Sequence, residues 1–149
     1  MHRNHTRWFV ALPCVLLLAV QSAAGHVTMR PRYSPPGESD TYIVRVPTER
    51  QSATVRLEAE FPSEVVVEDF EPESGWTVET KKNADGKVIG VVWSGGSIPP
   101  GESMQFHFTV RNPTQETTLV WKMVQIHADG SRAEWAPNTI VGAPSSGAE

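Results

Sequence analysis

Histidine is the residue type in this 149-residue chain with the clearest capacity for metal chemistry, and one histidine is singled out by its position. His26 directly follows the small residues of "SAAG", so cleavage after Gly25 would make it the first residue of a mature chain. It would then carry a free α-amine, a group whose ordinary pKa is about 7.7–8.0. The amine and the imidazole Nδ1 of one residue can close a six-membered chelate ring. Two such nitrogens together with oxygen donors suit Cu(II).

Two further histidines have surroundings that favour structural roles. His107 occupies a polar-face position in "MQFHFTV", where a solvated strand histidine is the simpler interpretation. His127 opens the turn "HADGS", and a role without metal is again the simpler one. Met29 carries a thioether, which favours Cu(I), but the alternation of a strand can point it away from His26. Whether Met29, His107 or His127 binds metal is left open by the sequence.

The segment before His26 has the parts of a secretory signal peptide. Arg3 and Arg7 give a positive start, and a mostly apolar run of 13 residues follows. That run is short of the roughly 20 residues that span a bilayer. Cleavage after Ala24 and cleavage after Gly25 both satisfy the small-residue rule, and they leave different N-termini. We therefore expect a signal peptide at residues 1–25 and a secreted, periplasmic or cell-envelope location after its removal.

Removal of residues 1–25 leaves a small acidic domain. It takes away two of the 13 basic residues and none of the 17 acidic ones, so the remaining 124 residues carry a formal net charge of −6. Such a charge argues against nucleic acid as a partner. The single cysteine, Cys14, is lost as well, so packing rather than a disulfide must hold the domain together. We expect a domain over residues 26–141 and a flexible polar tail over 142–149, with no transmembrane anchor after cleavage.

Alternating apolar residues predict the strands that must position these side chains. A period of two marks a strand with one buried face. Three segments show it, with these residues predicted to point inward: Tyr42, Val44 and Val46; Val55, Leu57, Ala59 and Phe61; Met104, Phe106, Phe108 and Val110. Four other segments are strand candidates: "EVVVEDF", "WTVETK", "KVIGVVW" and "TTLVWKMVQIH".

Turn residues separate the predicted strands. "NADGK" and "HADGS" each hold an Asp-Gly pair, a strong hairpin signal, and "SGGSIPPGES" predicts a loop. No segment shows a helical period. Seven or so short strands at this spacing predict an all-β fold, an antiparallel β-sandwich of immunoglobulin or cupredoxin type.

Local signals for an enzyme are lacking. There is no glycine-rich phosphate loop after a strand, no zinc motif on a helix and no G-x-S-x-G elbow, although a Ser-His-Asp triad can assemble from distant residues. We expect a binding module, not an enzyme. One alternative is a histidine-brace copper oxidase of polysaccharides, which would need His107 or His127 as a second histidine. The other is a metal-free structural or adhesive sandwich.

The segment "GHVTMRPRYSPPGESDTYIVRVPTER" resembles the start of the YcnI-like family of secreted bacterial copper-binding domains. The similarity continues in order through "FEPESGWTVE", "VVWSGGSIPPGE", "FHFTVRNP", "LVWKMVQIHADGS" and "EWAP". It implies an immunoglobulin- or cupredoxin-like sandwich that holds Cu(II) in a monohistidine brace. His26 matches the N-terminal histidine of that brace, Glu49 falls where the family places a carboxylate ligand, and Trp135 falls where it places a tryptophan beside the metal.

The resemblance also implies a role in copper acquisition, delivery or homeostasis, with copper transport or chaperone proteins as partners. The residues alone would make Glu49 a solvated turn acid and would also allow Trp135 to be a plain core residue. If Glu49 is a ligand, Arg50 could orient it; otherwise Arg50 is simply a surface residue. Met29 stands where the family more often has a small aliphatic residue, and the membrane-spanning tail of many relatives is absent from this sequence. The other tryptophans after residue 25 are expected in the core: Trp76, Trp93 and Trp121.

Overall fold

The computed structural model describes residues 25–144, in which the chain forms twelve β-strands. The predicted signal peptide, apart from Gly25, lies outside these described residues, as do residues 145–149 of the predicted tail. The strands are β1 (Thr28–Arg30), β2 (Tyr33–Ser34), β3 (Ser39–Pro47), β4 (Thr54–Glu60), β5 (Val66–Phe70), β6 (Thr77–Lys82), β7 (Val88–Ile98), β8 (Ser103–Arg111), β9 (Thr117–Val120), β10 (Lys122–His127), β11 (Arg132–Trp135) and β12 (Asn138–Val141). Within residues 25–144 there is no helix that could cross a membrane.

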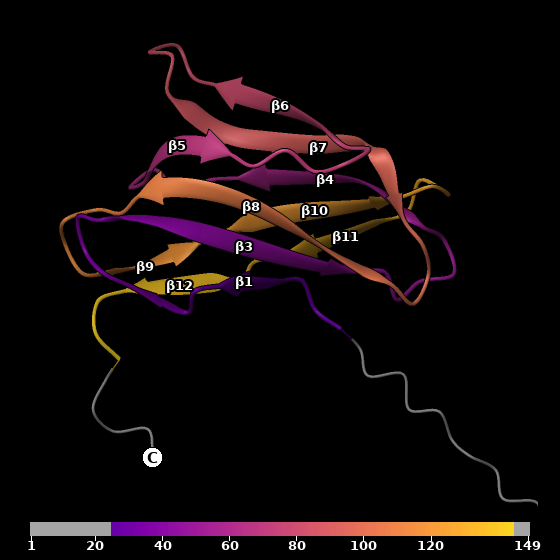
Figure 1. Ribbon diagram of the computed structural model, residues 1–149, viewed down its shortest axis with the longest axis horizontal. Coiled ribbons are helices and arrows are strands. Elements are labelled where there is room, and N and C mark those ends of the chain that lie inside the picture. The colour runs from indigo at the N-terminus through magenta and orange to yellow at the C-terminus, as the bar shows by residue number, and fades with distance from the viewer. Residues whose placement is uncertain (1–24, 145–149) are drawn as a thin grey trace, which may run out of the picture.

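Two antiparallel sheets pack against each other, as the alternation predicted. The four-stranded sheet has the order β1-β3-β8-β5, and the five-stranded sheet has the order β11-β10-β4-β7-β6. A third sheet, β2-β12-β9, closes one side, with β2 parallel and β9 antiparallel to β12. Figure 1 shows the long strands β3 and β8 crossing over the strands of the five-stranded sheet, while the β6–β7 hairpin extends beyond them. The predicted antiparallel sandwich is therefore confirmed.

An aromatic cluster fills the space between the sheets. The rings of Tyr42 and Trp121 have centroids 4.8 Å apart, and those of Trp93 and Phe106 are 5.1 Å apart. The inward faces predicted for β3 and β8 are confirmed, except that Met104 is only half-buried against the core. Trp93 and Trp121 are fully buried, as expected of core tryptophans, and aromatic pairs at these distances add to the stability gained from burial.

The inward face predicted for β4 is correct for Leu57, Ala59 and Phe61 but wrong for Val55. Val55 is partly exposed, and the buried residue at this end of the strand is Thr54. The reason is a shift in the pairing of β4 with β7 between Thr54 and Arg56. A bulge of this kind reverses the side-chain alternation from one residue to the next.

The two Asp-Gly hairpins are confirmed, whereas the loop predicted over "SGGSIPPGES" is shorter than expected. Gly86 and Gly130 take positive φ angles of 79° and 82° in the two hairpin turns. β7 continues through the glycines to Ile98, because the same shift in pairing leaves residues 95–97 as a bulge within the strand. The connection to β8 is therefore limited to residues 99–102.

The bulge in β7 lies under a tryptophan, and this contact predicts the effect of one substitution. A Cβ at Gly96 would lie 2.2 Å from two atoms of the Trp76 indole, which itself packs edge-on to Phe106 with centroids 5.1 Å apart. We expect Gly96→Ala to lower the free energy of unfolding by about 1–3 kcal/mol through overpacking, measured by urea denaturation. In a Trp76→Leu background the same change should cost much less. Equal losses in both backgrounds would contradict a clash with the indole.

Candidate metal centre

The first strand brings the N-terminal segment to one end of the sandwich. β1 pairs antiparallel with β3, and Thr28 lies opposite Arg45, so the residues before β1 run toward the turn that follows β3. Val27 and Met29 are both only 4% exposed and belong to the core, whereas His26 is exposed. The alternation therefore turns Met29 into the core and away from His26.

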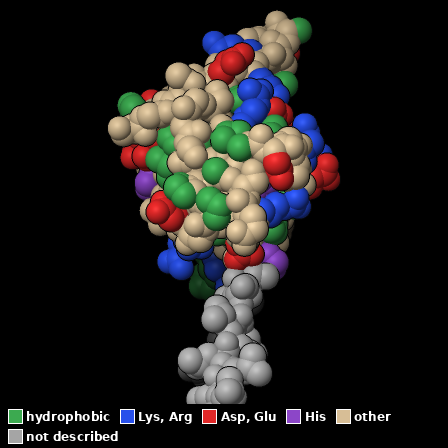
Figure 2. Space-filling view, turned by 90° about the vertical axis from the view of Figure 1, so that its right-hand side faces the viewer, with side chains coloured by type: hydrophobic (Ala, Val, Ile, Leu, Met, Phe, Trp, Pro, Cys, Tyr) green, Lys and Arg blue, Asp and Glu red, His purple; other side chains and the backbone are tan. Residues whose placement is uncertain are grey.

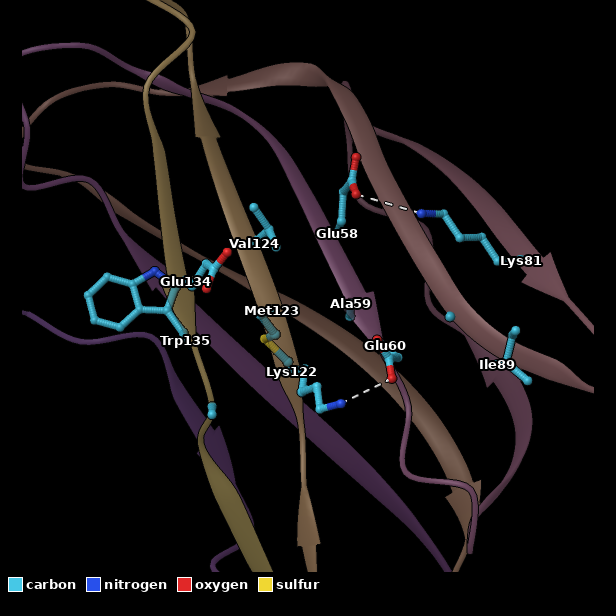
Figure 3. Close-up of a pocket in the computed structure, with 12 residues that line it drawn as sticks. Glu58, Ala59, Glu60, Lys81, Ile89, Lys122, Met123, Val124, Glu134 and Trp135 are labelled. Atoms are coloured by element: carbon cyan, nitrogen blue, oxygen red, sulfur yellow. Dashed lines mark hydrogen bonds and ion pairs between the residues drawn. The ribbon is translucent and has the colours of Figure 1, made fainter.

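His26 lies beside Trp135, the last residue of β11. Their ring centroids are 5.4 Å apart and the planes are inclined by 50°. Trp135 is partly buried and packs against the core, so its indole forms a fixed wall on one side of the exposed imidazole. Figure 3 shows this indole turned away from Glu58 and Lys81, which lie farther across the five-stranded sheet.

Glu49 approaches the same end of the chain from the turn between β3 and β4. Its carboxylate Oε1 accepts a hydrogen bond from the backbone N–H of Gly25, the residue directly before His26. A Cβ added at Gly25 would lie 3.1 Å from the ring of Pro47. Glu49 itself is exposed. Figure 2 shows acidic and histidine side chains together at the end of the molecule where the grey segment joins it. The fold thus gathers His26, Glu49 and Trp135, three residues far apart in the sequence.

The donors at this end are few. Among the side chains of residues 25–144, no group of three or more His, Cys, Asp or Glu residues is arranged to hold a metal ion. The candidate centre contains two side-chain donors, the imidazole of His26 and the carboxylate of Glu49. A further nitrogen donor, the α-amine, arises if the chain begins at His26.

Arg50 does not orient Glu49 in this structure. Its Nη2 donates a hydrogen bond to the carbonyl oxygen of Arg132 at 3.4 Å, which ties the β3–β4 turn to β11. In the described residues Arg50 thus has a partner on β11 rather than the Glu49 carboxylate.

The other two histidines have partners outside the candidate centre. His107 lies on β8, half-buried, with its Nδ1 3.4 Å from Glu73 Oε1 and 4.0 Å from Glu71 Oε2. His127 is buried at the end of β10, with its Nδ1 3.0 Å from the carbonyl oxygen of Ser52. The structure thus gives His127 an internal hydrogen bond and places His107 next to two glutamates on the outer face of the four-stranded sheet.

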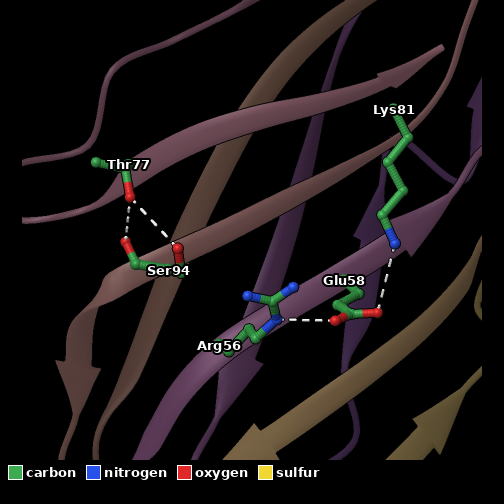
Figure 4. Close-up of polar contacts among 5 residues, drawn as sticks. All are labelled: Arg56, Glu58, Thr77, Lys81 and Ser94. Carbon is green, nitrogen blue, oxygen red and sulfur yellow. Dashed lines mark hydrogen bonds and ion pairs between the residues drawn. The ribbon is translucent and has the colours of Figure 1, made fainter.

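A groove beside Trp135 runs across the outer face of the five-stranded sheet (Figure 3). Four of its charged side chains form pairs across the strands: Lys81 lies 3.6 Å from Glu58, and Lys122 lies 3.4 Å from Glu60. Arg56 adds a hydrogen bond of 2.8 Å to Glu58 (Figure 4). This bond, with smaller contributions from the nearby basic groups, lowers the pKa of the Glu58 carboxyl. The groove therefore carries two ion pairs and one further carboxylate, that of Glu134.

The lowered pKa of Glu58 predicts a pH-dependent stability. Because the ionised carboxylate is favoured in the folded protein, it contributes stability above the unfolded-state pKa, and this contribution is lost as the pH falls through the folded-state pKa. We expect Glu58→Gln to lower the free energy of unfolding by less than about 1 kcal/mol at neutral pH, since the pair is partly exposed, and to have no effect in acid. Urea unfolding at both pH values measures this. Glu60→Gln, at a pair whose side chains are about two-thirds exposed, is the control. A loss for Glu58→Gln that is equal at both pH values would contradict the assignment.

Solved structures similar to this chain establish its fold class. An uncharacterized protein from Nocardia farcinica, described as having an immunoglobulin-like fold, matches with a TM-score of 0.71 at 23% sequence identity, over 79% of this chain and 99% of that one. A cohesin module from a family 33 glycoside hydrolase of Clostridium perfringens matches with a TM-score of 0.56 at 14% identity, over 79% of this chain and 96% of that one. The predicted immunoglobulin-like sandwich is confirmed.

Sequence comparison identifies the family. Copper-binding protein CutI of Bacillus subtilis (strain 168) is 33% identical over 133 residues, which are 88% of this chain. The chain spans 65% of the length of that relative. Residues 26–148 match the family described as "Domain of unknown function (DUF1775)", and the match begins at His26. The resemblance to the YcnI-like proteins is thereby confirmed, and the chain belongs to the DUF1775 family.

Proposed function

We propose that this protein binds Cu(II) outside the cytoplasm, through a monohistidine brace formed when the chain is cleaved between Gly25 and His26. His26 supplies its α-amine and imidazole, Glu49 supplies a carboxylate, and Trp135 lies beside the metal. The observation that carries the proposal is the position of His26. Its ring centroid lies 5.4 Å from that of Trp135, and the residue before it, Gly25, donates its backbone N–H to the Glu49 carboxylate.

The donor set fits Cu(II) in number and kind. An amine, an imidazole and a carboxylate are ligands that copper accepts in a tetragonal arrangement, and copper stands highest among the divalent metals in affinity for such sites. One carboxylate leaves a net charge of +1 on the centre. In the uncleaved chain the carboxylate is occupied by the Gly25 N–H. Cleavage after Gly25 removes that partner and creates the amine in the next residue, so both donors become available together.

The relative supports copper as the metal. The similar Bacillus subtilis protein is named as a copper-binding protein, and the family match covers the segments that carry His26, Glu49 and Trp135. We extend this to a binding role in copper acquisition, delivery or homeostasis, without catalysis. The partners would be copper transport or chaperone proteins. The extracytoplasmic location rests on the predicted signal peptide.

Fluorescence tests the proposed position of the metal. Paramagnetic Cu(II) quenches a nearby indole strongly and a distant one weakly. We expect the form that begins at His26 to bind one Cu(II) and to lose part of its tryptophan emission on binding. Trp135→Phe should remove most of the emission that copper quenches, because Trp135 is the tryptophan in contact with His26.

Trp76→Phe is the matched control, since Trp76 is also partly buried against the core and packs on Phe106. It should leave the copper-dependent quenching intact. Quenching that survives in Trp135→Phe and disappears in Trp76→Phe would place the metal elsewhere.

A further inference from the structure

A buried glutamine joins the segments that form the candidate centre. Gln125 lies on β10 and is only 2% exposed. Its Oε1 accepts a hydrogen bond from the Trp135 indole Nε1–H at 3.0 Å. Its Nε2 donates to the carbonyl oxygen of Pro47 at 2.9 Å and to the hydroxyl of Thr54 at 2.7 Å. Both amide hydrogens of Gln125 are therefore used, and one of their acceptors, the carbonyl of Pro47, lies two residues before Glu49 in the sequence.

The chemistry of the partners fixes the orientation of this amide. An indole N–H can only donate and a carbonyl oxygen can only accept. If the amide were turned by half a rotation, its NH₂ group would face the Trp135 N–H and its oxygen would face the Pro47 oxygen. Gln125 thus has one possible orientation, and that orientation connects Trp135 to the end of β3.

The connection continues to the residue before Glu49. The hydroxyls of Thr54 and Thr48 lie 2.7 Å apart, and both side chains are buried. The backbone of Thr48 is also held, because its N–H donates to Glu102 O at 2.8 Å and its carbonyl accepts from Gly101 N–H at 2.7 Å. The residue directly before Glu49 is therefore fixed in place by its backbone and its side chain.

A polar side chain at this position needs a reason. Position 125 faces the interior of a sandwich, where a buried donor or acceptor without a partner costs about 1–3 kcal/mol. An apolar residue would avoid that requirement, as Met123 does two residues earlier on the same face. The partners of the Gln125 amide lie on β11, on β4 and at the end of β3, the elements that carry or adjoin Trp135 and Glu49.

We propose that Gln125 is a positioning residue of the metal centre, which holds the Trp135 indole and the segment before Glu49 in a fixed relation before copper arrives. This inference rests on the proposed function for its copper-dependent part, whereas the hydrogen-bond network exists without metal. Groups that hold metal ligands in place contribute about 10–100-fold to metal affinity in known sites. A fully satisfied buried network also makes its surroundings rigid.

The test compares the wild-type form beginning at His26 with Gln125→Met, which keeps the length of the side chain and removes its hydrogen bonds. Without metal, we expect the indole N–H of Trp135, identified in NMR spectra by its loss in Trp135→Phe, to exchange with solvent at least about 10-fold faster in Gln125→Met. With copper, we expect about 10–100-fold weaker binding in competition with a chelator and an altered Cu(II) EPR spectrum.

Thr139→Val is the matched control. Thr139 is buried, accepts a hydrogen bond from the Trp121 indole at 3.2 Å and donates one to Pro31 O at 3.0 Å, so it holds another tryptophan in a similar way. This variant should lose stability and keep the Cu(II) affinity and EPR spectrum of the wild type. A change in copper binding as large as that of Gln125→Met would show that lost stability alone explains the effect, and would overturn the inference.

Thr54→Val is a second variant, which removes only the hydroxyl between Gln125 and Thr48, and we expect it to weaken Cu(II) binding as well. If Gln125→Met and Thr54→Val fold and keep the Cu(II) affinity and EPR spectrum of the wild type, the inference is overturned. If only one of them folds, the same result in that variant overturns it. Failure of the wild type to bind Cu(II) would refute the proposed function instead. The metal-free exchange of the indole N–H would then still decide whether Gln125 holds Trp135.

Discussion

Acetylation of the α-amine of His26 should weaken Cu(II) binding by more than about 100-fold relative to the same chain with a free amine. The amide formed by acetylation is a poor donor, and the chelate ring between amine and imidazole is lost. Loss of groups that only orient a ligand already costs about 10–100-fold, so loss of a ligand should exceed that range. Competition with a chelator of known affinity measures the difference.

The free energy of unfolding without copper, measured for both forms, is the control for folding. His26 is exposed and its backbone precedes β1, so the acetyl group should leave the free energy of unfolding without copper unchanged. The uncleaved chain, in which the Gly25 N–H binds Glu49, should behave like the acetylated form. Equal Cu(II) affinity in the free and acetylated forms would refute a brace at the N-terminus.

Glu49→Gln should weaken Cu(II) binding by at least about 10-fold and change the EPR spectrum of the copper centre. Glutamine has nearly the same size as glutamate but no negative charge, so the centre would carry +2 in place of +1. Because Glu49 is exposed, the substitution should have little effect on the free energy of unfolding in the absence of copper. Isothermal titration and EPR on the form beginning at His26 measure both effects.

His107→Ala and His127→Ala are the controls for this prediction. His107 contacts Glu71 and Glu73, so its replacement should leave copper binding intact. His127→Ala removes a buried hydrogen bond to Ser52 O and should lower stability while the folded protein still binds copper. Loss of binding in either variant, with none in Glu49→Gln, would favour the two-histidine brace. Peroxide-driven oxidation of a glycan would then be the assay to perform.

Alternation of apolar residues predicted the sandwich because its long strands each bury one face. The faces of β3 and β8 follow that period closely, since β3 and β8 pair without a register shift along their length. The period failed at Val55 and in the glycine segment of β7, where one bulge changes the pairing of both strands. A bulge depends on how two distant segments match, and local sequence carries little of that information.

The short strands were not predicted for a similar reason. β1, β2, β11 and β12 have two to four residues each, too few to show a period. Each of them is set by pairing with a segment distant in the sequence or across a turn: β1 pairs with β3, β11 with β10, and β12 with β2 and β9. Two of these strands carry the candidate centre. β1 directs His26, and β11 ends at Trp135.

The candidate residues were therefore predictable to different degrees. The proposed role of His26 rests on the predicted cleavage site before it, whereas Glu49 and Trp135 were indicated only by the resemblance to a family. Gln125 was missed, although a signal for it exists: in "KMVQIH" a glutamine stands at an inward position between Met123 and His127. A polar residue on the buried face of a strand indicates a specific hydrogen-bonding need.

The burial of Val27 next to the exposed His26 affects how easily an aminopeptidase could remove the N-terminal residue of the proposed centre. In a chain that begins at His26, only one residue projects beyond the core, and the next peptide bonds lead into a buried side chain and then into a strand paired with β3. An aminopeptidase cannot draw this end into its active site unless β1 first detaches from the sheet, an opening that costs part of the stability of the fold. If the chain is cleaved before His26, the pairing of β1 with β3 would thus both position this histidine and shield the new N-terminus from aminopeptidases.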